Sequence, residues 1–122
     1  SGKIALGTDF PVEKVNPLST FYSAVARKDV EGNPSNGFLK QNALTRVEAL
    51  KGMTIWAAYS NFEDSFKGSI ETGKFADFVI LTDDIMKVPE EEITNVNVLA
   101  TIVNGSIVFK KINWYFLLFY IF

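Results

Sequence analysis

The chain has 122 residues, enough for one compact domain and too few for two of ordinary size. It contains no His and no Cys, which excludes disulfide bonds, the usual nitrogen and sulfur ligands of zinc, and the Ser/His and Cys/His nucleophile pairs. A net charge of −2 supplies no overall field that would attract nucleic acid or an anionic membrane, so neither is expected as a partner.

The first quarter of the chain predicts one strand and one helix. Residues 3–6 are short, apolar and partly β-branched, and the turn sequence Gly-Thr-Asp follows them, which is typical of a strand. Residues 18–27 place apolar side chains at helical spacing and predict an amphipathic helix. Residues 29–37 hold so many Gly, Asn and Pro that only a loop accommodates them.

Two further helices are expected in the middle of the chain. Thr45 and Glu48 have the spacing of a capping box, in which each side chain satisfies a backbone donor at the start of a helix. The first of these helices should therefore begin at Thr45 and end near Met53, where Gly and Thr interrupt the pattern. A second, short helix is expected over residues 55–59.

Strands dominate the predictions for the last third of the chain. Residues 78–81 form a continuous apolar run that ends at Thr-Asp-Asp, which predicts a buried strand. Residues 96–103 and 106–109 flank Asn104-Gly105, the pair that favours a two-residue hairpin turn. Between the strands expected at residues 78–81 and 96–103, Pro89 is followed by three Glu, which is typical of the first turn of a helix.

The C-terminal residues 112–122 contain one polar residue and no charge. Eleven residues fall well short of the roughly 20 that span a bilayer as a helix, so no transmembrane segment is expected. We interpret the segment as an extension that finds an apolar surface to cover, with a partner-binding or interfacial segment as the alternative. Residues 1–10 lack the apolar run of a signal peptide, which favours a cytoplasmic location.

Several features that resemble functional sites have simpler explanations. The acidic groups 63–64, 83–84 and 90–92 are expected in solvated loops and at a helix start rather than as catalytic pairs. Residues 68–74 have the Gly and Lys spacing of a phosphate-binding loop, but Phe75 replaces the magnesium-binding Ser or Thr and a strand follows. Three aromatic side chains are expected in the core: Trp56, Tyr59 and Phe62.

Three motifs in fixed order carry a resemblance to a known family. They are residues 7–13 (GTDFPVE), residues 44–50 with 57–59 (LTRVEAL and AAY), and residues 67–81 (KGSIETGKFADFVIL). Together they resemble the amidohydrolase superfamily, in the branch that includes N-substituted formamide deformylase-like enzymes. The resemblance extends over about residues 4–109.

The resemblance implies a much longer parent enzyme, because a (β/α)₈ barrel alone takes about 250 residues. Residues 1–66 would be the remnant of the barrel's last strand and the helices that follow it. Residues 67–110 would be the C-terminal part of a small β-sandwich domain, and residues 111–122 an apolar aromatic tail outside the family pattern. The fold class that we expect for this chain is therefore α+β.

Asp9 is the candidate site residue. By resemblance it corresponds to the carboxylate at the end of the last barrel strand, which binds the metal or handles the proton of the attacking water. From the residues alone, an Asp after Gly-Thr is better explained by a turn in which its side chain accepts backbone hydrogen bonds. The resemblance implies a divalent metal, with zinc expected, in full-length relatives; none is expected here, because the metal-binding histidines are missing.

Two functional hypotheses follow. In the first, the chain is a fragment of a metal-dependent hydrolase that acts on carbon–nitrogen bonds in amide-like substrates, and it is inactive when isolated. In the second, it is a non-catalytic α+β binding or structural module that associates with itself. A homo-oligomer is expected through the strand at residues 3–6, whose edges would be free, or through the apolar tail.

Overall fold

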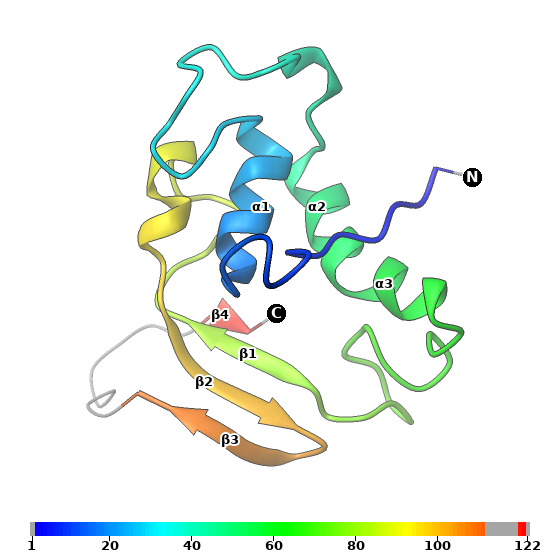
Figure 1. Ribbon diagram of the computed structural model, residues 1–122. Coiled ribbons are helices and arrows are strands. Elements are labelled where there is room, and N and C mark those ends of the chain that lie inside the picture. Colours follow the sequence, from blue (N-terminus) through cyan, green and yellow to red (C-terminus); the bar gives the residue numbers. More distant parts are fainter. Residues whose placement is uncertain (1, 112–119, 122) are drawn as a thin grey trace.

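The computed structural model describes residues 2–111 and 120–121 and shows a small α+β chain in which helices lie on one side of an antiparallel sheet (Figure 1). This agrees with the predicted fold class. The α-helices are α1 (Pro17–Ala26), α2 (Arg46–Met53) and α3 (Ile55–Ser60), and the 3₁₀-helices are η1 (Lys40–Asn42) and η2 (Glu90–Asn95). The strands are β1 (Phe78–Leu81), β2 (Val98–Val103), β3 (Ser106–Lys110) and β4 (Tyr120–Ile121).

The helices begin where the sequence supplies caps. At α1, the Asn16 side chain accepts a hydrogen bond from the Leu18 N–H at 3.1 Å, and Pro17 occupies the first helical position, where no N–H is needed. At α2 the predicted capping box is present in full. The predicted short helix is confirmed as α3.

The sheet has the order β3-β2-β1-β4, and all its pairs are antiparallel. The β2–β3 hairpin turns through Asn104 and Gly105, whose φ angles are +49° and +76°. Both angles lie in the left-handed region that Asn and Gly tolerate, so the predicted hairpin turn is confirmed. The predicted buried strand at residues 78–81 is confirmed as β1, and the Pro-Glu-Glu-Glu run opens η2.

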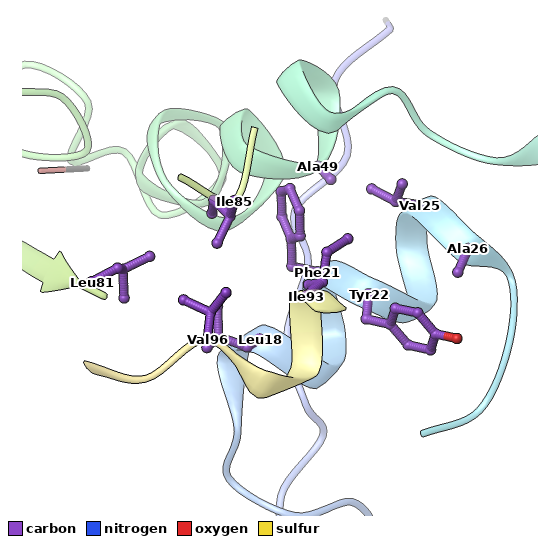
Figure 2. Close-up of a cluster of buried hydrophobic side chains, with 10 residues drawn as sticks. All are labelled: Leu18, Phe21, Tyr22, Val25, Ala26, Ala49, Leu81, Ile85, Ile93 and Val96. Carbon is purple, nitrogen blue, oxygen red and sulfur yellow. The ribbon is translucent and has the colours of Figure 1, made fainter. Parts of the chain in front are cut away.

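One hydrophobic core joins the helices to the sheet side of the molecule. Phe21 from α1 and Ile93 from η2 have no exposed surface, and Leu81 at the end of β1 is 2% exposed. Figure 2 shows these side chains together with Ala49 of α2. Because the cluster draws on residues from both halves of the chain, neither half encloses this core alone.

The prediction of a strand at residues 3–6 is wrong. The segment belongs to no sheet; instead, the Leu6 N–H donates to the Gly52 carbonyl oxygen at 3.0 Å, beside α2. A Cβ added to Gly52 would lie 2.9 Å from the Leu6 side chain, so the close approach requires the glycine. A β-strand needs neighbours to satisfy its backbone groups, and α2 supplies only one hydrogen bond here.

The expectation that Trp56, Tyr59 and Phe62 belong to the core is wrong, because the buried cluster contains none of them. Phe62 is 91% exposed and Tyr59 is 49% exposed, while Trp56 is half-buried. Phe62 follows the end of α3 with a φ of +60°, and the chain turns there in a way that directs its ring into solvent.

Within residues 2–111 and 120–121, no helix has the length and apolar character that a membrane span requires. Most of the apolar tail predicted over residues 111–122 lies outside the described residues. Its described part consists of Lys111 and the two residues of β4, which pair with β1.

Candidate functional site

Asp9, the candidate site residue, lies in an exposed turn. Its φ of +51° places it in the left-handed region, and its main-chain carbonyl accepts the Val12 N–H at 2.9 Å. Among the described residues, its carboxylate has no hydrogen-bond partner, so the predicted side-chain bond to turn amides is not formed. The backbone makes the turn, and the carboxylate is left open to solvent.

The second and third motifs meet at a solvent-open hollow of about 870 Å³. One wall comes from the end of α2 and from α3, and the other from the loop over residues 67–71 together with Asp77. A Cβ on Gly68 would lie 2.7 Å from the Cβ of Ala58, so the loop contacts α3 with no room for a side chain at this position. Asp9 does not line this hollow.

The Asp of the third motif has a structural role. Asp77 Oδ1 accepts the Asn104 N–H at 2.7 Å, and the neighbouring Ala76 carbonyl accepts the Gly105 N–H at 3.0 Å. The motif therefore anchors the tip of the β2–β3 hairpin. In the same loop, Lys74 is largely covered and donates to the Ser69 hydroxyl at 2.7 Å. Sequence reasoning did not identify the bond between Asp77 and Asn104, because these residues lie 27 positions apart in the chain.

Two of the other acidic side chains, Glu63 and Asp84, stabilise local structure. Hydrogen bonding from Asn61, assisted by Lys67, lowers the pKa of Glu63 and keeps it charged. Asp84 accepts the Met86 N–H at 2.9 Å and pairs with Lys87 at 3.2 Å. Glu63 and Asp84 therefore both have partners within the chain.

The residues present do not fit a metal site. In the part of the chain that the structure describes, no three His, Cys, Asp or Glu side chains are grouped so that they could hold an ion. Asp9 stands alone, and a catalytic zinc site takes three protein ligands. No chemical step through a metal is therefore derived for this chain.

The comparisons with known proteins agree with the resemblance carried by the motifs. A sequence model of the amidohydrolase family matches residues 2–109. The putative amidohydrolase YtcJ of Bacillus subtilis is 30% identical over 105 residues, which cover 86% of this chain and 20% of the relative. The N-substituted formamide deformylase of Arthrobacter pascens is 31% identical over 109 residues, or 89% of this chain and 20% of the relative.

A third relative, the protein LONG AFTER FAR-RED 3 of Arabidopsis thaliana, is 35% identical over 103 residues, covering 84% of this chain and 17% of the relative. No solved structure shows significant similarity. The chain thus spans about a fifth of the length of these relatives. Since the family match extends over most of its residues, the chain belongs to the amidohydrolase family.

Proposed function

We propose that this chain is a fragment of a metal-dependent hydrolase that cleaves carbon–nitrogen bonds in amide-like substrates. The observation that carries the proposal is the family match over residues 2–109, combined with relatives about five times as long as the matched segment. One of those relatives is named for the deformylation of N-substituted formamides, which is a carbon–nitrogen bond cleavage.

In the parent enzyme, residues 1–66 would supply the last strand and the following helices of a barrel, and residues 67–110 part of a small β-domain. This division is supported by the order of elements, since all three α-helices precede residue 67 and β1 to β3 follow it. Residues 3–6 would become a strand only where neighbouring barrel strands pair with it.

Asp9 would be the parent's proton-handling carboxylate. An exposed carboxylate without a partner is available to take a proton from water and deliver it to a leaving amine. The chain lacks the histidines that would bind the metal, which in the parent would come from other segments. The isolated chain should therefore be inert.

The test is an assay of the purified chain with N-formyl and other amide substrates, with and without added zinc. No hydrolysis above the buffer rate is expected. Metal-dependent hydrolysis that scales with protein concentration would contradict the proposed inactivity. Reading the DNA upstream of residue 1 tests the fragment itself, because an open frame that continues into a His-x-His motif is expected.

In the extended protein encoded by such a frame, Asp9→Asn should abolish hydrolysis without changing the melting temperature, because the Asp9 side chain stabilises nothing in the described structure. Glu13→Gln, in the same exposed turn region, is the matched control and should retain activity. Full activity of Asp9→Asn would remove Asp9 from the reaction.

The second candidate function is a module that associates with itself. The observation that favours it is the number of exposed apolar side chains, among them Phe10 at 66%, Val12 at 76% and Phe62 at 91%. Apolar side chains as exposed as these would lose contact with water if a second copy covered them. Light scattering over a concentration series would show a rising mean mass if copies associate, and a constant monomer mass would contradict this function.

A further inference from the structure

The two outer strands of the β1–β3 unit differ in the features that protect a sheet edge. Edge strands of natural proteins commonly carry charges and β-bulges, which discourage pairing with other chains. Strand β3 has both: Lys110 lies in it, and Val108 is the extra residue where the β2–β3 register shifts. The sequence of β3 is thus that of an edge strand.

Strand β1 has neither feature. Its four residues, Phe78–Leu81, are all apolar, and none of them is more than partly exposed. The register shift between β1 and β2 inserts its extra residue, Leu99, in β2, so β1 itself is regular. A continuous apolar run of this kind is typical of a strand whose two faces are both covered, and it lacks the charges that protect an open sheet edge.

Within the family-matched residues 2–109, however, β1 has only one sheet partner, which is β2. The second partner comes from outside the match. Strand β4 pairs antiparallel with β1, with Ile121 opposite Ile80 and Tyr120 opposite Leu81 (Figure 1). The open edge of β1 is therefore filled by a segment that the family pattern does not include.

We infer that the outer edge of β1 is a strand-acceptor site and that β4, residues 120–121, is its occupant. Strand β4 satisfies backbone groups at that edge, in the way that an extended peptide adds a strand to an open sheet. The proposal concerns backbone pairing and does not depend on the hydrolytic function of the parent enzyme.

The backbone geometry identifies the amide that reports on this pairing. Successive N–H groups of a strand point to opposite sides. The Thr82 N–H donates to the Asn97 carbonyl oxygen at 3.0 Å and therefore points toward the β2 side. The Ile80 N–H, two residues earlier, points to the same side. The Leu81 N–H consequently points toward β4, and its exchange with solvent measures the occupancy of the acceptor site.

The test replaces Tyr120 and Ile121 with Pro in the full chain, which removes both β4 N–H groups and prevents regular pairing. Hydrogen exchange by NMR should then show the Leu81 amide exchanging about five to ten times faster, as expected for the loss of one or two backbone hydrogen bonds. The Ile80 amide, bonded toward β2, should keep its rate and serves as an internal control.

The matched control replaces the same two residues with Val, which keeps both N–H groups and favours a strand. It should leave Leu81 as protected as in the unaltered chain. Deleting residues 112–122 should reproduce the effect of the two prolines. An unchanged Leu81 rate in both the proline variant and the deletion, or equal acceleration of Leu81 and Ile80, would overturn the proposal.

Discussion

At Thr45, reciprocal hydrogen bonds close the first turn of α2. The Thr45 hydroxyl accepts the Glu48 N–H at 3.2 Å, and the Glu48 carboxylate accepts the Thr45 N–H at 2.8 Å. Two backbone donors that the helix itself leaves without partners are thereby satisfied. This is also the residue-scale feature that the sequence predicted in full, because a capping box depends only on residues three apart.

Replacing Thr45 with Ala should lower the free energy of unfolding by about 1 kcal/mol, since the Glu48 N–H loses its acceptor. Urea denaturation followed by circular dichroism measures the change. Thr45→Ser keeps the hydroxyl and should retain nearly all the stability. Equal destabilisation by Ser and Ala would show that the methyl group, rather than the cap, supports the helix.

The same box predicts a dependence of stability on pH. Hydrogen bonds from the Thr45 side chain and backbone lower the pKa of Glu48 below its ordinary value of 4.5. A carboxyl whose pKa is lower in the folded state stabilises the fold above pH 4.5, and the contribution is lost as the pH falls through the lowered value.

We expect the difference in urea midpoint between the unaltered chain and Glu48→Gln to be largest near neutral pH and to shrink below that ordinary pKa. A matched control is Glu13→Gln, which alters a carboxylate in the exposed N-terminal turn. If the difference in urea midpoint between Glu48→Gln and the unaltered chain stays constant from about pH 6 to about pH 3, the charge of Glu48 does not contribute to stability.

At the scale of elements, long side chains join segments that are distant in sequence. The Arg46 guanidinium, at the first residue of α2, donates to the Ile85 and Val88 carbonyls at 2.6 Å each. Lys40 donates to the Val25 and Ala26 carbonyls at the end of α1 and pairs with Glu90 of η2 at 2.8 Å. The contacts of Arg46 and Lys40 thus connect α2 and α1 to the segment between β1 and β2.

Arg46→Lys should destabilise the chain by about 1.5 kcal/mol, because an ammonium group cannot reach both carbonyls with the fixed spacing of a guanidinium. The measurement is again urea denaturation at neutral pH. Lys51→Arg, the reverse exchange at an exposed position of the same helix, should change stability little. Equal free energies of unfolding for Arg46→Lys and Lys51→Arg would show that the bidentate geometry at Arg46 does not contribute to stability.

Local elements were predictable and their tertiary partners were not. Helices α1 to α3 and the β2–β3 hairpin follow from periodicity, caps and the Asn-Gly turn, all of which act within a few residues. The strand at residues 3–6 was mispredicted because an apolar β-branched run specifies a strand only when a neighbouring strand is present. Arg46 gave no local signal, since its acceptors lie about 40 residues away.

At the scale of the whole molecule, the candidate site also depends on partners that are distant in sequence. Asp9 could be identified only through the order of three motifs, and the structure leaves it alone in an exposed turn. A catalytic site needs several groups from different segments, and this chain spans about a fifth of the length of its relatives. Apolar side chains such as Val12 and Phe62 are left uncovered at the surface.

Phe62 offers the sharpest test of what this uncovered surface does. It is 91% exposed and its backbone is in the left-handed region, which Asn adopts more readily than Phe. Phe62→Asn should therefore leave the free energy of unfolding unchanged or slightly increased while removing an apolar contact. If copies associate through this surface, light scattering should give a lower mean mass for Phe62→Asn than for the unaltered chain at equal concentration.

Phe62→Tyr is the matched control, because it keeps the aromatic ring and should preserve any association. A mean mass that is the same for the Asn and Tyr variants, and above that of the monomer, would exclude the surface around Phe62 as the contact. Self-association would then have to use other exposed apolar residues, of which Phe10 and Val12 in the N-terminal turn are the next to replace. These two side chains are chosen because association is driven by burial of apolar area, and Phe10 and Val12 are 66% and 76% exposed.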